Sequence, residues 1–170
     1  PVAAKAKLQC SNHTLSVTLT PSDTDNYDVI GTLCSRGPVA GKTVQLLLHG
    51  STYARYYWDF PYQTRHYSYV RAATARGYAT FNLDRIGNGE SDRPDGKLVD
   101  ITTNAFVVHQ VVEALRNGEF ASQSFEKVIV VGHSMGSFTT IYYAGSFPGE
   151  ADGIILGNYL TTPGASPQRD

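Results

Sequence analysis

Short apolar runs alternate with segments of helical spacing along most of this chain, and the alternation limits the fold more than any other feature. An apolar run ended by glycine or turn residues is typical of a buried strand, whereas apolar residues spaced as from Val108 to Leu115 are typical of one helix face. We expect the helix containing Val108 to begin at a cap on Asp100 or Thr102 and to end at Gly118. Strands joined by helices form right-handed crossover units and a parallel sheet. The expected strands lie at residues 42–50, 78–84, 127–131 and 151–158, and the expected helices at 63–76, 100–117 and 134–147.

The first 41 residues have a different pattern, which indicates an antiparallel hairpin. Residues 16–20 and 27–33 read as strands around the turn-rich segment PSDTDN. If the chain folds back near Ser22, residues whose numbers sum to about 44 face each other, and Cys10 and Cys34 meet this condition. The geometry therefore permits a cross-strand disulfide, with two reduced thiols as the alternative.

A Cys10–Cys34 disulfide would imply an oxidising compartment. The glycosylation sequon at Asn12 points the same way, although such triplets are frequent by chance. We therefore expect a protein that is secreted or held in another oxidising compartment.

Composition excludes several classes of function. The 170 residues are 41% hydrophobic, which is enough for one domain with a sizeable core. A net charge of −1 argues against nucleic-acid partners and against anionic membranes. No apolar run approaches the roughly 18 residues that a membrane span needs. The sequence also has no metal-ligand spacing and no dinucleotide fingerprint, so we expect no cofactor.

The segment GHSMG places Ser134 between two glycines, directly after the expected strand 127–131 and before the expected helix 134–147. A sharp turn from strand to helix strains the serine backbone, and a Cβ at Gly132 or Gly136 would crowd it. The turn also holds the Ser134 hydroxyl near the positive end of the following helix. This pattern indicates a catalytic nucleophile, and the alternative is a loop serine that caps a helix.

A serine nucleophile needs donors for the oxyanion that it creates. The amide of Met135 is one donor in this arrangement. The loop HGSTY, which follows the strand 42–50, supplies the second, and Ser51 is a better candidate than Thr52. His49 lies at a strand end beside glycine, where we expect it to brace the loop rather than act as a base.

Three segments together, HGSTY, LDRIGNGESDRP and VVGHSMGS, resemble the alpha/beta-hydrolase superfamily in order and spacing. The resemblance covers residues 42–158 and implies the first six strands of that fold, mostly parallel after an antiparallel N-terminal hairpin. Its nucleophile would be Ser134, which separates the chain from the Asp-nucleophile branch of dehalogenases and epoxide hydrolases. The implied organisation is a hairpin at 1–41, a hydrolase core at 42–158, and the start of a lid or cleaved loop at 159–170.

The superfamily places its acid and its histidine after the serine, and here the chain departs from the pattern. No histidine follows Ser134, and the chain's five are His13, His49, His66, His109 and His133. We expect His133 to point away from the Ser134 hydroxyl, and His66 and His109 to lie on helices in solvent or core roles.

The carboxylates do not replace the missing acid. After Ser134 the acids are Glu150, Asp152 and Asp170. Asp152 begins a strand at the wrong edge of the sheet and Asp170 lies in the tail, while Asn158 has the right position but only an amide. Asp84 is expected to hold its own glycine-rich loop.

We therefore expect the acid and the histidine to come from roughly 100 or more residues outside this chain. They would lie either in a second chain, the C-terminal half of a cleaved precursor, or in a part removed by truncation. Alone, the chain would expose one face of its sheet and one unpaired edge.

Eight aromatic residues lie between Tyr53 and Tyr69, close to the expected oxyanion loop. We expect most of them to pack the first helix onto the sheet, and the rest to line an apolar mouth suited to an acyl or aryl group. Arg55 is expected to be a solvated loop charge. The leading function is hydrolysis of an ester or lactone, a small-molecule substrate, through an acyl-enzyme at Ser134. The alternatives are carbon–carbon cleavage, cyanohydrin lyase or cofactor-free peroxidase chemistry on the same fold, and a non-catalytic ligand binder.

Overall fold

The computed structural model describes residues 6–159, which form one six-stranded sheet in the order β1-β2-β4-β3-β5-β6. The pairs β1–β2 and β2–β4 are antiparallel, and the remaining pairs are parallel. This arrangement confirms the expected mostly parallel sheet with an antiparallel N-terminal hairpin. The strands are β1 (Leu8–Val17), β2 (Tyr27–Arg36), β3 (Thr43–Leu48), β4 (Ala79–Leu83), β5 (Lys127–His133) and β6 (Gly153–Gly157).

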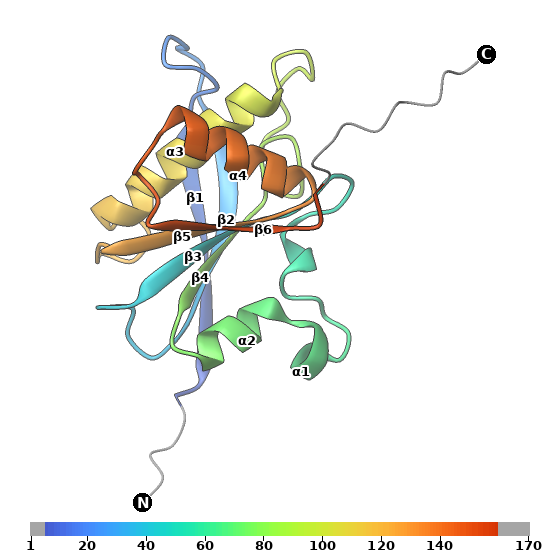
Figure 1. Ribbon diagram of the computed structural model, residues 1–170. Coiled ribbons are helices and arrows are strands. Elements are labelled where there is room, and N and C mark those ends of the chain that lie inside the picture. The colour runs from blue at the N-terminus through green and yellow to red at the C-terminus, as the bar shows by residue number, and fades with distance from the viewer. Residues whose placement is uncertain (1–5, 160–170) are drawn as a thin grey trace, which may run out of the picture.

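Helices cover both faces of the sheet (Figure 1). The long helices α3 (Ile101–Asn117) and α4 (Met135–Ser146) pack on one face, where they enclose the larger apolar core. The shorter α1 (Thr64–Tyr67) and α2 (Tyr69–Ala75) lie on the other face, preceded by the 3₁₀ turn η1 (Arg55–Tyr57). Asp100 caps α3 in a capping box with Thr103, and Gly118 ends the helix at φ 79°.

The single helix expected over residues 63–76 is wrong, because Ser68 interrupts it. Ser68 has an extended backbone, with φ −95° and ψ 110°, and its hydroxyl accepts a hydrogen bond from the Arg71 amide to start α2. The same hydroxyl donates to Asp59, and the two residues form an isolated β-bridge. A contact with a residue outside the segment therefore breaks the helix into α1 and α2.

The hairpin has the register expected from the sequence. Cys10 faces Cys34 across β1 and β2, and the two form a disulfide with a Cα–Cα distance of 4.1 Å. The hairpin therefore carries a covalent link, which is compatible with an oxidising compartment.

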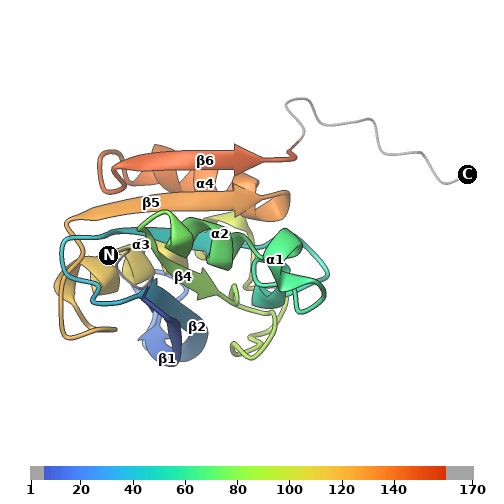
Figure 2. The ribbon, with the colours of Figure 1, turned by 90° about the horizontal axis from the view of Figure 1, so that it is seen from below.

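The edge formed by β6 carries apolar side chains that nothing in residues 6–159 covers. Figure 2 shows β5 and β6 without a helix on the side where α2 lies. Ile154 and Ile155 of β6 are exposed, as are Phe138, Ile141 and Tyr142 on α4. The expected unpaired edge is therefore present at β6, whereas the expected exposure of one face is limited to the part of the sheet near this edge. None of the described helices has the length and apolar character that crossing a bilayer requires.

Candidate active site

Ser134 occupies the junction between β5 and α4 in a backbone conformation that serine rarely adopts. Its φ is 53° and its ψ is −117°. Such conformations cost about 1–3 kcal/mol and persist only where the surrounding structure imposes them. The side chain is half-buried, and within the described residues its hydroxyl has no hydrogen-bond partner. The turn therefore presents an unengaged hydroxyl at the carboxyl edge of the sheet.

The flanking glycines are required by close backbone contacts. A Cβ on Gly136 would lie 2.2 Å from the carbonyl oxygen of Leu48, and a Cβ on Gly132 would lie 2.4 Å from the carbonyl oxygen of Gly136. Real Cβ atoms do not come this close to backbone atoms, so both positions exclude larger residues. The expected crowding at these two glycines is confirmed, and the turn after β5 packs directly on the end of β3.

The loop after β3 lies against Ser134. A Cβ built on Gly50 would be only 3.0 Å from the Cβ of Ser134. The amides of Ser51, which follows Gly50, and of Met135, which follows Ser134, donate no hydrogen bond to any atom of residues 6–159. Two N–H groups without an acceptor in the described chain therefore lie directly after Gly50 and directly after Ser134, an arrangement suited to binding an oxyanion.

A cavity of about 570 Å³ adjoins these residues. It lies between the loop after β4 and the start of α3, and Ser51 and Met135 form part of its wall. Its other walls combine apolar groups, such as Ile86 and Val99, with the guanidinium groups of Arg85 and Arg93. The volume falls within the range of ordinary small-molecule sites.

His49 braces the loop and is not placed as a base. Its ring is fully buried, its Nδ1 lies 2.7 Å from the Gly50 carbonyl oxygen, and its Nε2 accepts a hydrogen bond from the Arg85 amide at 3.1 Å. Because a carbonyl only accepts and an amide only donates, these partners require a neutral ring protonated on Nδ1. Burial, assisted by the charge of Arg85, lowers the pKa of His49 to about 4.

His133 is also engaged elsewhere. Its Nδ1 lies 2.5 Å from the Tyr53 hydroxyl, its Nε2 lies 3.5 Å from the Asn158 amide, and its ring stacks on Tyr57 with centroids 4.5 Å apart. Burial lowers the pKa of His133. Its ring is therefore part of an aromatic cluster beside Ser134, and no hydrogen bond joins it to Ser134 within the described chain.

Two of the remaining three histidines lie on helices, as the sequence suggested, and His13 lies on β1. His66 is on α1, and His109 on α3 pairs with Glu150 and stacks on Phe147. Asp152 precedes β6 and accepts a hydrogen bond from the Val128 amide, at the edge of the sheet opposite Ser134.

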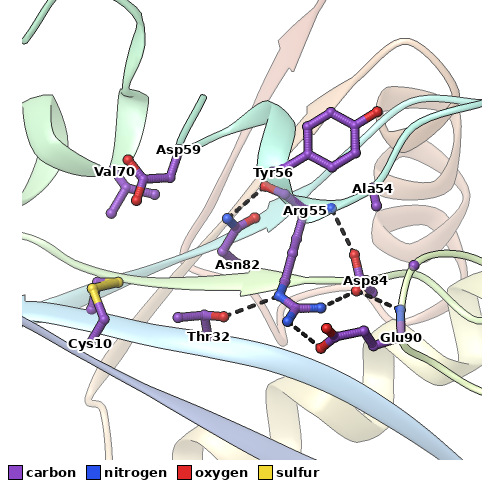
Figure 3. A pocket seen from close by; sticks show the side chains of 12 residues that line it. Cys10, Thr32, Ala54, Arg55, Tyr56, Asp59, Val70, Asn82, Asp84 and Glu90 are labelled. Carbon is purple, nitrogen blue, oxygen red and sulfur yellow. Dashed lines mark hydrogen bonds and ion pairs between the residues drawn. A yellow bond between two sulfur atoms is a disulfide. The ribbon is translucent and has the colours of Figure 1, made fainter. Parts of the chain in front are cut away.

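Asp84 holds its own loop, but it also binds Arg55, which the sequence suggested would be solvated. The Asp84 carboxylate accepts hydrogen bonds from the amides of Arg55 and Glu90 at 2.7 and 2.9 Å. Arg55 pairs with both Asp84 and Glu90 and donates to Thr32 (Figure 3). This network closes the side of a second cavity of about 460 Å³ next to the disulfide. No sequence pattern predicted this pairing, because the two partners are 29 positions apart in the chain.

The expected role of the aromatic segment needs correction. Only Trp58 among its eight aromatic residues is buried, and Tyr53 and Tyr69 are half-buried. The other five are exposed in this chain: Tyr56, Tyr57, Phe60, Tyr62 and Tyr67. Most of these rings therefore do not pack the first helix onto the sheet.

Comparison with known proteins agrees with this geometry. The family model described as the alpha/beta hydrolase family matches residues 45–169, which include the loop after β3, the loop after β4 and the turn at Ser134. The chain belongs to the alpha/beta hydrolase family. Comparison with curated protein sequences gives no match for it.

Solved structures of several other proteins share the fold of this chain. The epoxide hydrolase CorEH is 22% identical with a TM-score of 0.62, and the alignment covers 95% of this chain and 46% of that one. A membrane phospholipase A, described as a bacterial virulence factor, is 23% identical with a TM-score of 0.66 and coverage of 95% and 42%. The Pyrococcus furiosus esterase Pf2001 is 19% identical with a TM-score of 0.58 and coverage of 83% and 48%. The chain thus spans less than half the length of these relatives.

The described residues contain no group of three or more His, Cys, Asp or Glu side chains arranged to hold a metal ion. The groups that the site offers are one hydroxyl without a hydrogen-bond partner and two main-chain N–H groups without an acceptor in the described chain.

Proposed function

We propose that the protein is a serine hydrolase that acts on a carboxylic ester or lactone. The Ser134 hydroxyl attacks the substrate carbonyl while a histidine takes its proton, and the amides of Ser51 and Met135 bind the oxyanion. The carbon–oxygen bond to the leaving alcohol then breaks as the histidine returns the proton to that alcohol. Water repeats the sequence on the acyl-enzyme and releases the acid.

The observation that carries this proposal is the conformation of Ser134. A helix-capping serine does not require φ 53° and ψ −117°, and here the hydroxyl caps nothing. The structure maintains the strained turn by packing Gly136 on the end of β3, which also brings Gly50 next to Ser134. A strained serine in contact with a loop of unengaged amides is expected of a nucleophile.

The proposal assigns the catalytic acid and histidine to residues outside this chain. Hydrogen bonds to other groups occupy His49 and His133. The other three histidines lie on β1, α1 and α3: His13, His66 and His109. The partner would be the C-terminal half of the same enzyme, docked on the exposed apolar surface of α4 and the free edge of β6. This surface contains Ile154 and Ile155, and burying such side chains on a partner is favourable by about 25 cal/mol per Å². An intact native sample with a polypeptide mass of only about 18.5 kDa would contradict this assignment.

The shape of the site supports this choice of substrate class. The cavity of about 570 Å³ beside Ser51 and Met135 has apolar walls at Ile86 and Val99, and exposed tyrosines follow the oxyanion loop. A hydrophobic acyl or aryl group suits these surroundings better than a peptide, which needs many main-chain partners.

We also propose that the protein is secreted and carries a glycan on Asn12. Asn12 is exposed on β1, and its side-chain oxygen accepts a hydrogen bond from Thr32 at 2.8 Å, which leaves the amide nitrogen available. A glycosidase that removes N-linked glycans should shift the mass of the native protein. The shift should disappear in Thr14→Ala and persist in Thr14→Ser, and an unshifted native protein would contradict the proposal.

A fluorophosphonate probe tests the hydrolase function on the full-length protein. We expect one label per molecule, mapped to Ser134, and none on Ser134→Ala. Before labelling, the enzyme should turn over p-nitrophenyl esters or lactones, and labelling of Ser134 should abolish this activity. A folded protein that takes no label would be a ligand binder. A protein that takes the label but hydrolyses neither substrate would instead favour lyase or peroxidase chemistry.

A further inference from the structure

Arg85 is a buried arginine without an acidic partner. It follows β4 directly, and only 6% of its surface is exposed. None of the ion pairs found among residues 6–159 includes it. Arginine is almost never buried unless it is paired, because removing its charge from water is costly. Burial lowers the pKa of Arg85 to about 10, which still leaves it charged at neutral pH.

The guanidinium group binds neutral oxygens, and two of them belong to the oxyanion loop. Nε donates to the His49 carbonyl at 2.9 Å, Nη2 donates to the Gly50 carbonyl at 3.0 Å, and Nη1 donates to the Asn104 side chain at 3.1 Å. The Arg85 amide also donates to the His49 ring. One residue therefore holds two successive carbonyls of the loop and the histidine that braces it.

The Gly50 carbonyl and the Ser51 N–H belong to the same planar peptide unit. In a trans peptide these two groups point in opposite directions. Arg85 Nη2 and His49 Nδ1 both bind the carbonyl end, so the N–H end must point away from them. This N–H has no acceptor within the described chain, and Gly50 contacts Ser134. Donors bound at a carbonyl also polarise the peptide and strengthen its N–H as a donor.

We propose that Arg85 is a positioning residue that sets the direction and the donor strength of the Ser51 amide by binding the Gly50 carbonyl. This inference rests on the proposed hydrolase function of Ser134. Arg85 itself need not touch the substrate. Its contribution should appear when the oxyanion forms and should be small in the ground-state complex, because catalysis depends on interactions that strengthen in the transition state.

The chain offers a matched control in Arg116. Its Nε and Nη1 also donate to main-chain carbonyls, those of Glu150 and Glu126, and it pairs with Asp152. These contacts lie near the beginning of β5, whereas Ser134 follows its end. Replacing Arg116 therefore removes a similar structural anchor without altering the oxyanion loop.

The test compares Arg85→Lys with Arg116→Lys in the full-length enzyme, with kcat referred to the sites titrated by a fluorophosphonate. Loss of one oxyanion donor lowers kcat by about 100- to 1000-fold in other hydrolases, so a loosened donor should lower it by about 10- to 100-fold with KM nearly unchanged. In Arg85→Ala, millimolar guanidinium should restore part of kcat, whereas it should not improve Arg116→Ala. Because kcat is counted per titrated site, partial unfolding does not alter the comparison.

Two results would overturn the inference: an Arg85→Lys kcat equal to that of the wild type or of Arg116→Lys, or a loss confined to KM. A wild-type protein that neither labels nor turns over substrate would instead contradict the hydrolase function itself. The two failures are therefore distinguishable.

Discussion

Replacing Gly136 by alanine should separate Ser134, the proposed nucleophile, from the loop after β3. The added Cβ would lie 2.2 Å from the Leu48 carbonyl oxygen and 2.8 Å from that of His49, whereas ordinary contacts begin at 3.4 Å. Both neighbours are backbone atoms, so no side chain can rotate to make room. The start of α4 and the end of β3 must therefore move apart by about 1 Å, which is the scale of displacement that costs about 100-fold in rate.

The measured quantities are kcat on a p-nitrophenyl ester, referred to titrated sites, and the free energy of unfolding in urea. We expect Gly136→Ala to lower kcat by about 100-fold and to lower the free energy of unfolding by about 1–3 kcal/mol, as overpacked cores do. Gly145→Ala in the same helix is the control, because nothing lies within 4 Å of its added Cβ. This control should leave kcat unchanged and raise the free energy of unfolding by about 0.5–1 kcal/mol. A folded Gly136→Ala enzyme with wild-type kcat would refute the packing argument.

Three further predictions concern stability. Replacing Cys10 and Cys34 by serine should lower the free energy of unfolding by about 3 kcal/mol, because the disulfide closes a loop with a sequence separation of 24; an unchanged urea midpoint would contradict this. The pKa of His49 falls from 6.5 in the unfolded chain to about 4 in the fold. The neutral, buried ring therefore contributes fully to the free energy of unfolding above pH 6.5, and this contribution is lost as pH falls through 4. That loss should approach about 3 kcal/mol, and His49→Gln should show a weaker pH dependence in urea titrations at pH 7 and pH 4.5. Asp84→Asn should lower the free energy of unfolding by about 3–5 kcal/mol, because it leaves the exposed Glu90 as the one carboxylate paired with Arg55 in the described chain. A melting temperature equal to that of the wild type would argue against the network.

The parts of the fold that depend on local pattern and on one-to-one strand pairing were predictable. The pairing of Cys10 with Cys34 followed from residue numbers, because each residue of an antiparallel ladder faces one partner. The strained turn at Ser134 followed from its two glycines and the strand before it, since few residues other than glycine tolerate such close backbone contacts.

The parts that depend on long-range side-chain contacts were not predictable. The break at Ser68 arises from Asp59, which lies outside the helical segment and leaves its periodicity intact. The role of Arg85 depends on its side chain turning back to the loop after β3, 36 residues earlier in the chain. A turn-rich sequence does not predict which way a side chain in it will point. Tyr56 and the aromatic residues near it are exposed. The number of aromatic residues in a segment does not predict whether another part of the fold will cover them.

A crystal structure of the full-length protein inactivated by a phosphonate would test the central claim most directly. The adduct should form on the Oγ atom of Ser134, and one phosphonyl oxygen should lie about 2.7–3.1 Å from the amide nitrogens of both Ser51 and Met135. An adduct on another residue, or a phosphonyl oxygen that points to solvent away from these two amides, would contradict the account.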